Sequence, residues 1–180
     1  MSVTLHTSLG EIKARPEPNK LDVNRIYRSK YFARPYLKRQ RTFSPSPLRA
    51  NTMVAYSTRN IKSFMIQTGD PTGTGKGGQS IYGKPFADEV RSTLKFNARG
   101  VVAMANSGPD TNKAQFFITY AKQPHLDTKY SIFGRVIDGL DTTLDAMERV
   151  PVNEKMRPTV PIKLERVEVH ANPIAEKALQ

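Results

Sequence analysis

The 180-residue chain contains no cysteine, which excludes a disulfide scaffold, a thiolate zinc site and a cysteine nucleophile. It also lacks an apolar run of about 18 residues and an apolar stretch after Met1, so we expect neither a membrane span nor a secretory signal. Its histidines, His6, His125 and His170, lack the spacing of metal ligands. We therefore expect no bound metal and no cofactor.

What the chain does have is the composition of one globular domain, with 38% apolar and 24% charged residues. The net charge of +12 is unevenly distributed. Residues 14–58 hold ten Lys/Arg and two Asp/Glu, a net charge of +8, whereas the other 135 residues hold 18 and 14, a net charge of +4. Because the basicity belongs to one segment, the total charge does not by itself predict a nucleic-acid-binding protein.

The parts of the chain outside 14–58 have the patterns of β-structure. Residues 1–13 alternate apolar and polar side chains on both sides of a turn at 8–10, which predicts a hairpin. A helix is predicted at 141–150, which Pro151 ends. Clusters of Gly, Pro, Asn and Asp separate short apolar runs at 63–67, 101–105, 115–119, 131–136 and 163–170. Many short strands with few helices favour a barrel or a sandwich.

The most glycine-dense stretch is TGDPTGTGKGG at 68–78. A phosphate-binding Walker loop requires Gly-Lys followed by Ser or Thr before a helix. Here Gly77 follows Lys76 and no helix pattern comes next, so we interpret the stretch as a surface loop whose glycines permit close backbone approach.

Four stretches concentrate aromatic, methionine and amide side chains: FMIQTGD at 64–70, MANSGPDTN at 104–112, QFFIT at 115–119 and HLDTKYSIFGRV at 125–136. None contains a nucleophile with a base and an orienting group, or a carboxylate pair with a matching base. An apolar floor with a few hydrogen-bonding groups at its rim is typical of a peptide-binding pocket. Taken alone, each stretch also fits an ordinary core strand and turn.

Together these stretches resemble the cyclophilins, a family of peptidyl-prolyl cis-trans isomerases. FMIQTGDPTGTGKGGQSIYGKPFADE resembles the family's FMxQxGDxxxGxGxGGxSIYGxxFxDE, and RGVVAMANSGPDTNKAQFFIT resembles its xGxxSMANxGPNTNxSQFFIT. The resemblance implies a mainly β fold, an eight-stranded antiparallel barrel capped by two helices, as one domain over 1–172 with a tail at 173–180. QPHLD and VEVHANP are similar to the peptidyl-prolyl isomerase-like 3 group, which implies spliceosomal partners and a cytoplasmic or nuclear location.

The resemblance also implies a role for each matched position. Arg59 matches the catalytic arginine. Tyr130 stands where many cyclophilins have a histidine, and His125 stands where many have the tryptophan that contacts cyclosporin, which marks His125 as an altered drug-contact position. The substrate-binding residues implied around the proline pocket and its groove are Phe64, Met65, Gln67, Ala105, Asn106, Gln115, Phe117, Leu126 and Tyr130.

The chemistry of this family requires such residue types. Rotation about an X-Pro bond meets a barrier of about 18–20 kcal/mol, because the bond has partial double-bond character. When the bond twists it loses conjugation, and its nitrogen becomes pyramidal and basic. A fixed guanidinium that donates to this nitrogen binds the twisted state more tightly than either planar state, which lowers the barrier without proton transfer.

Residues 14–58 depart from the family, which has a strand, a helix and a strand ending in Phe-His where this chain has RTFSPSPL and Ser57-Thr58. We hypothesise that the segment is out of frame or mis-spliced, because one choice of codons for RTFSPS, read two bases later, encodes Asn-Phe-Leu-Ala-Leu-Ser, which resembles the family's helix. The barrel would then lose a strand and a helix and keep unpaired edges. The alternative is a genuine basic insertion that binds RNA.

The sequence therefore predicts an isomerase that acts on X-Pro bonds of proline-containing peptides and proteins and assists their folding. The alternative is a non-catalytic proline-peptide binding module in a spliceosomal assembly. We expect no membrane contact and no direct binding of nucleic acid.

Overall fold

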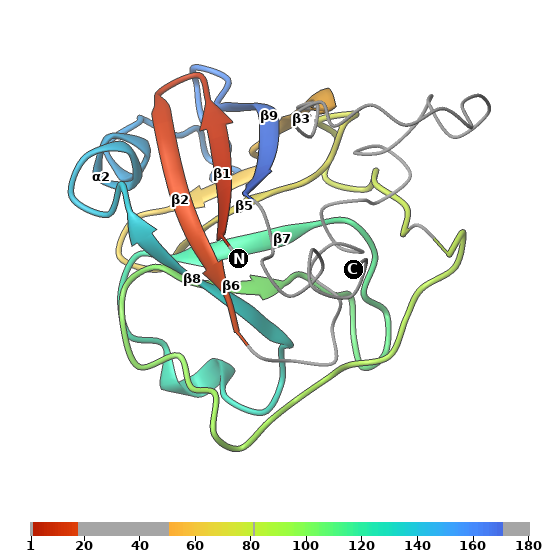
Figure 1. Cartoon of the computed structure of the whole chain (residues 1–180). Coiled ribbons are helices and arrows are strands. Elements are labelled where there is room, and N and C mark those ends of the chain that lie inside the picture. Colours follow the sequence, from red (N-terminus) through yellow and green to blue (C-terminus); the bar gives the residue numbers. More distant parts are fainter. Residues whose placement is uncertain (1, 18–50, 81, 171–180) are drawn as a thin grey trace, which may run out of the picture.

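One antiparallel sheet dominates the computed structural model, which describes residues 2–17, 51–80 and 82–170 (Figure 1). Its nine strands are β1 (Ser2–Thr7), β2 (Gly10–Pro16), β3 (Asn51–Tyr56), β4 (Arg59–Ile61), β5 (Met65–Thr68), β6 (Val101–Met104), β7 (Phe116–Thr119), β8 (Ile132–Asp138) and β9 (Lys163–His170). Their order in the sheet is β3-β9-β1-β2-β8-β6-β7-β5-β4. An α-helix, α2 (Thr143–Glu148), and a 3-10 helix, η1 (Pro124–Leu126), complete the regular elements of these residues.

β1 and β2 form the predicted hairpin, in which Leu5 lies opposite Ile12 and Thr7 opposite Gly10. Gly10 has a φ of 131°, which L side chains rarely adopt, and its carbonyl accepts a hydrogen bond from the Thr7 hydroxyl at 2.6 Å. Leu5 and Ile12 are buried on the same face of the hairpin. The turn therefore sets a register that directs one apolar face inward.

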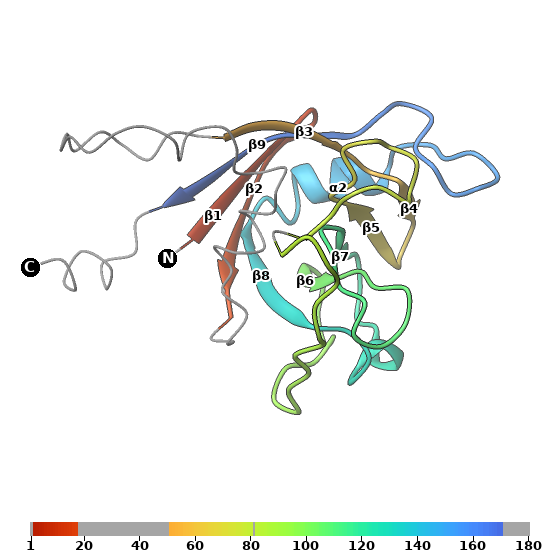
Figure 2. The ribbon, with the colours of Figure 1, turned by 90° about the vertical axis from the view of Figure 1, so that its right-hand side faces the viewer.

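The two ends of the sheet are joined by consecutive residues of the chain. β3 pairs with β9 at one end and β4 pairs with β5 at the other, and only Ser57 and Thr58 separate β3 from β4. The Ser57 N–H donates to the Ile162 carbonyl and the Thr58 N–H to the Gln67 carbonyl, each at 2.9 Å. The sheet therefore curls into a half-barrel, which Figure 2 shows from the side.

The mainly β, antiparallel fold is confirmed, with differences in its details. The sheet has nine strands because the closing strand divides at Ser57 and Thr58, where its pairing partner changes from β9 to β5. The strand expected to be lost from 14–58 is present as β3, since main-chain pairing tolerates the unexpected side chains. Of the two expected helices, α2 falls within 141–150. The other, like the tail at 173–180, lies outside the described residues.

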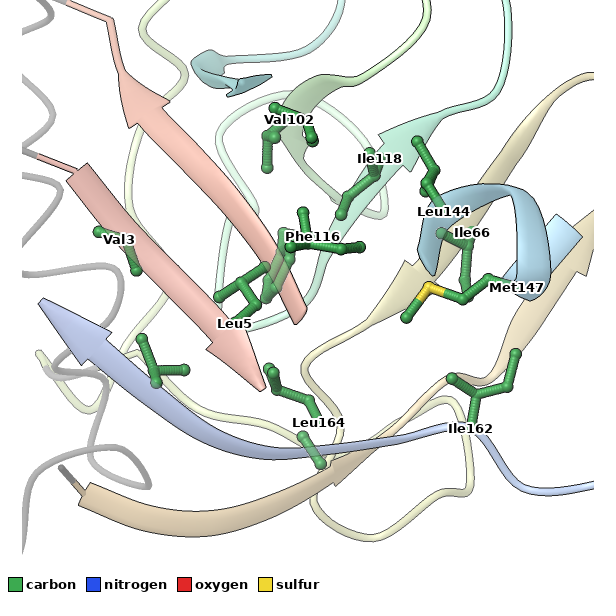
Figure 3. Packing of buried hydrophobic residues seen from close by; sticks show 14 of the residues in the cluster. Val3, Leu5, Ile66, Val102, Phe116, Ile118, Leu144, Met147, Ile162 and Leu164 are labelled. Atoms are coloured by element: carbon green, nitrogen blue, oxygen red, sulfur yellow. The ribbon is translucent and has the colours of Figure 1, made fainter. Parts of the chain in front are cut away.

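The strands bury side chains on both faces, because successive residues point to opposite sides of a sheet. We call the set inside the curl the inner cluster; Figure 3 labels its members Val3, Leu5, Ile66, Val102, Phe116, Ile118, Leu144, Met147, Ile162 and Leu164. Helix α2 covers one end of it with Leu144 and Met147. We call the second set the outer cluster; it comprises Met65, Phe96, Val101, Ala103, Phe117, Leu126 and Ile132.

Within the described ranges, no helix has the length and apolar composition needed to cross a membrane.

Candidate active site

A cavity of about 130 Å³ opens over the outer cluster. It is lined by Arg59 of β4, Met65 and Gln67 of β5, Phe117 of β7, Leu126 of η1, and the loop residues Phe64, Ala105, Asn106 and Tyr130. Every lining residue is one that the sequence resemblance marks as a site residue. The structure thus brings together side chains that are up to 71 positions apart, from Arg59 to Tyr130.

Strand register arranges the polar and apolar parts of the cavity in one row. Arg59 of β4 lies opposite Gln67 of β5, and Gln67 lies opposite Phe117 of β7. Phe117 in turn lies opposite Ala103 of β6. Because directly paired residues have Cβ atoms about 4.5–5.5 Å apart on one face, the row runs from a cation through an amide to an aromatic ring.

The floor of the cavity is apolar and rigid. Met65, Phe117 and Leu126 are 5%, 4% and 7% exposed. The Phe117 ring stacks on Phe96 with ring centroids 5.8 Å apart and meets Tyr130 edge to face at 5.4 Å. An apolar ring the size of proline would therefore meet a preformed surface instead of having to create one.

Arg59 is exposed at the cavity rim, and the next residue anchors its strand. Asn60 is 2% exposed. Its Nδ2 donates to the Met147 carbonyl at 2.9 Å, its Oδ1 accepts from the Tyr120 hydroxyl at 2.6 Å, and its N–H donates to the Met156 carbonyl at 2.8 Å. The three-residue strand β4 is thereby held from three directions, which fixes the backbone that carries Arg59.

A half-buried ion pair between Glu148 and Arg99 secures the same region. Glu148 of α2 accepts hydrogen bonds from the Ser63 N–H at 2.8 Å and from Arg99, whose guanidinium also donates to the Tyr120 carbonyl at 2.9 Å. Burial opposes ionisation of Glu148, but the bonds from Arg99 and Ser63 outweigh it and hold the pKa of Glu148 below its ordinary value. Burial and the charge of Glu148 raise the pKa of Tyr120, so its hydroxyl stays protonated and donates to Asn60.

Gln67, at the centre of the row, is held by a second amide. Its Nε2 donates to Oε1 of Gln115 at 2.7 Å, and Nε2 of Gln115 donates to the carbonyls of Gly75 and Gly77 at 3.1 and 2.8 Å. Although the resemblance places Gln115 in the peptide groove, it is absent from the cavity lining and lies behind Gln67. The structure therefore gives Gln115 a positioning contact to Gln67.

The glycine-rich stretch is a loop that closes on a carboxylate of its own chain. Asp70 is fully buried and accepts hydrogen bonds from the N–H groups of Gly75 at 2.6 Å, Gly77 at 3.2 Å and Thr72 at 2.8 Å. Burial opposes its ionisation, but these bonds prevail and lower the pKa of Asp70. A Cβ at Gly77 would lie 2.2 Å from the Asp70 carboxylate, which explains the glycine there. The loop N–H groups thus bind Asp70 and not a phosphate.

His125, the altered drug-contact position, lies beside the cavity. Its ring stacks on Phe64 with centroids 5.7 Å apart and an interplanar angle of 27°, and it is exposed. It does not belong to the cavity lining. His125 is therefore next to the cavity through its contact with Phe64, which is a lining residue.

Asn60, Tyr120 and Glu148 were not identified from the sequence, although they hold the strand that carries Arg59. Asn60 directly follows Arg59 in the motif RNIKSFMIQ, but nothing in the sequence around it marks it as an anchor. The partners of Asn60 and Glu148 are 49 to 96 residues away along the chain, so no local pattern reveals them.

The arrangement can bind a proline-sized ring on an apolar floor and direct a guanidinium at its rim. Among the described residues, no three His, Asp or Glu side chains are grouped to hold a metal ion. The cavity lining contains no carboxylate and no histidine. Its polar groups are the Arg59 guanidinium, the Gln67 and Asn106 amides and the Tyr130 hydroxyl, which can form hydrogen bonds with a ligand.

Comparison with known proteins defines the class. Residues 53–169 match the family described as cyclophilin type peptidyl-prolyl cis-trans isomerase/CLD, so the chain belongs to this family of isomerases. Within it, the chain is 57% identical over 180 residues to a protein from Mycosarcoma maydis named peptidyl-prolyl cis-trans isomerase-like 3, with 99% of this chain and 98% of that protein covered. A human protein of the same name is 50% identical over 182 residues, with 98% and 100% covered.

A solved structure supports the same assignment of the fold. The cyclophilin type peptidyl-prolyl cis-trans isomerase of Cryptosporidium parvum, solved in the presence of the dipeptide Ala-Pro, superposes with a TM-score of 0.78 at 36% identity. The match covers 96% of this chain and all of that chain.

Proposed function

We propose that the protein accelerates cis–trans isomerisation of X-Pro bonds, with Arg59 as the catalytic residue. One observation carries the proposal: an exposed guanidinium lies at the rim of a cavity of about 130 Å³ whose floor is apolar. Family membership and the Ala-Pro dipeptide present with the Cryptosporidium relative support a proline-containing substrate.

In this mechanism the proline ring packs on Met65, Phe117 and Leu126, and the rest of the chain leaves along the rim. The floor holds the ring while the preceding carbonyl group rotates. As the bond twists, Arg59 donates to the prolyl nitrogen, whose lone pair is then no longer conjugated. This contact exists only near the transition state, so it lowers the barrier instead of merely tightening binding.

The row of side chains sets the position of the Arg59 guanidinium relative to the apolar floor of the cavity. Gln67 lies between Arg59 and Phe117, and its amide is fixed by Gln115, so polar and apolar groups keep a constant separation. Asn106, another lining residue, donates from its Nδ2 to Oδ1 of Asp88 at 3.2 Å. Two amides held by other side chains can therefore orient a peptide while its ring lies on the floor.

Substitution of Arg59 tests the proposal. In a protease-coupled assay with a prolyl peptide, Arg59→Ala should lower kcat/KM by about a hundredfold, the effect of losing one charged donor, and change peptide affinity by no more than a few-fold. Lys62→Ala removes a neighbouring exposed cation outside the cavity lining and serves as the matched control. If wild-type protein binds the peptide but leaves its isomerisation at the spontaneous rate, the non-catalytic binding module is the correct interpretation.

We further propose that the protein acts in RNA-processing assemblies of the nucleus or cytoplasm and assists folding of proline-containing proteins there. This proposal rests on the resemblance of QPHLD and VEVHANP to the peptidyl-prolyl isomerase-like 3 group. Co-purification of the tagged chain with spliceosomal proteins, compared with a charge-matched cyclophilin of another group, tests it. Equal recovery with both baits would contradict the proposal.

A further inference from the structure

A second hollow, of about 710 Å³, adjoins the catalytic cavity. Asn106 and Tyr130 line both spaces, so a chain that leaves the cavity over these residues enters the hollow directly. The remaining wall is formed by the 107–110 loop, the turn at 128–129, and the side chains of Asp88 and Val90. Apart from Asp88, which holds Asn106, none of these wall residues is assigned a role by the proline-binding mechanism.

Two carboxylates are built into the wall of the hollow. The Asp88 N–H donates to Oδ1 of Asp110 at 2.7 Å, and the Asp110 N–H donates to Oδ2 of Asp88 at 2.9 Å. Oδ1 of Asp88 also accepts from Nδ2 of Asn106 at 3.2 Å and from Nδ2 of Asn112 at 2.7 Å. The carboxylate of Asp88 is therefore fixed on the same residue, Asn106, that separates the two spaces.

The backbone of the hollow is held in an uncommon conformation. Among the described residues, four that are not glycine have a positive φ, and two of them, Asp110 at 58° and Thr128 at 64°, line this hollow. L-residues adopt the left-handed conformation only at a cost in free energy, and a β-branched residue such as threonine adopts it least readily. The surrounding contacts therefore impose a specific shape on both walls.

The charge of the hollow is opposite to that of the chain. Its lining has two carboxylates, Asp88 and Asp110, and one ammonium group, that of Lys129. The whole chain has a net charge of +12. A cationic ligand is thus repelled at long range but attracted once it lies within this hollow, and the carboxylates need no reorganisation to receive it.

From these observations we propose that the hollow is a substrate subsite that binds a lysine or arginine side chain located within about three residues of the isomerised proline. An extended chain advances about 3.3–3.6 Å per residue, so three residues reach about 10 Å beyond the cavity. Asp110 is the specificity-determining residue, because its exposed carboxylate is the more accessible of the pair. The subsite rests on the proposed isomerase function, since it is defined relative to the bound proline.

The test uses isomeric prolyl peptides of identical composition and net charge. In one set an arginine occupies each position from one to three on either side of the proline; in the reference peptide it lies eight residues away. Wild-type protein should show at least one near position with a kcat/KM about three- to fivefold above the reference, the scale of an exposed ion pair. Equal values for all peptides would overturn the proposal.

Asp110→Asn is the decisive variant. It removes the charge, keeps an oxygen to accept from the Asp88 N–H, and suits the left-handed backbone, which asparagine tolerates. The ratio of near to reference kcat/KM should fall to about one, whereas Asp141→Asn, the same change at a distant exposed position, should preserve the ratio. If Asp110→Asn leaves this ratio unchanged, the charge of Asp110 does not cause the preference for an arginine near the proline, and the proposal is wrong.

Binding distinguishes this proposal from the isomerase proposal. Fluorescence anisotropy of the same peptides reports affinity without turnover. If no peptide is isomerised faster than spontaneously, the isomerase function has failed, and a near-to-reference affinity ratio of about three to five, lost in Asp110→Asn, still supports the subsite. If turnover is normal and both ratios are one, the subsite alone is wrong.

Discussion

The inner and outer clusters are built from neighbouring residues of the same strands, yet they serve different ends. On β7, Phe116 belongs to the inner cluster and Phe117 to the outer one, and on β5 Ile66 and Met65 divide in the same way. The inner cluster is enclosed by the curled sheet and by α2. The outer cluster is enclosed on one side and open on the other, where the cavity lined by Arg59 lies.

Because successive residues of a strand point to opposite faces of the sheet, the same strands supply both the enclosed core and the lining of the cavity. A residue inside the curl contributes to folding through complete burial. A residue on the other face that lines the cavity, such as Phe117, has part of its surface against the cavity, and that surface is what a ligand contacts. Stability and activity should therefore respond separately to substitutions one residue apart.

Replacing adjacent phenylalanines gives the largest expected contrast. Phe116→Ala should reduce the free energy of unfolding by about 3–5 kcal/mol, because it leaves a cavity in enclosed packing. Phe117→Ala should cost less stability, since water can enter the enlarged cavity, but should lower kcat/KM far more. Urea unfolding and the isomerase assay measure the two effects. Should Phe116→Ala prove too unstable to assay, the milder pair Phe116→Leu and Phe117→Leu must show the same reversal of rank for the comparison to stand.

Substitution of Glu148 tests whether its ion pair with Arg99 stabilises the end of the inner cluster near α2. The folded state lowers the pKa of Glu148 below its ordinary value of 4.5, so its charge stabilises the fold at higher pH, and this contribution is lost as the pH falls through the lowered value. Glu148→Gln should therefore cost about 1.5–3 kcal/mol at pH 7 and much less near pH 2. Glu154→Gln, at an exposed position, is the control. A difference between wild type and Glu148→Gln that is constant with pH would contradict this account.

The strands could be predicted where apolar runs carry the information. β9 matches its predicted range of 163–170, and β6, β7 and β8 lie within about two residues of theirs. β4 was missed because three residues, Arg59–Ile61, are too short for any periodicity. β3 was expected to be lost because its side chains depart from the family, yet its pairing with β9 is made by the main chain.

The candidate site residues were identified from long family motifs and not from composition or hydrophobic periodicity. Arg59, Gln67 and Phe117 form one row only because of the registers between β4, β5 and β7, which no single segment encodes. The same limit explains Asn60 and Tyr120, whose contact spans 60 residues of sequence. Family motifs contain such long-range pairings implicitly, whereas composition and periodicity do not. The frame hypothesis for 14–58 stays a prediction, which the coding DNA tests.

The smallest expected effect concerns a residue of the inner cluster that contacts the strand carrying Arg59. Tyr120 belongs to the inner cluster, but its hydroxyl donates to Asn60, which anchors the strand of Arg59. Tyr120→Phe removes this donor without changing the packing, so it should cost about 1 kcal/mol of stability and lower kcat by up to tenfold with little change in KM. Tyr56→Phe removes a hydroxyl outside this network and should not change kcat.

The split between kcat and KM is what makes this variant informative. A merely structural role of the Tyr120 hydroxyl would lower the folded fraction and reduce the apparent kcat in proportion, an effect that disappears when rates are corrected for folded protein. A positioning role leaves a lower kcat after that correction, because a shift of about 1 Å in a catalytic group can cost a hundredfold while binding on the floor persists. An unchanged corrected kcat would show that β4 is aimed by the Met147 and Met156 carbonyls alone, and that the inner cluster has no part in catalysis.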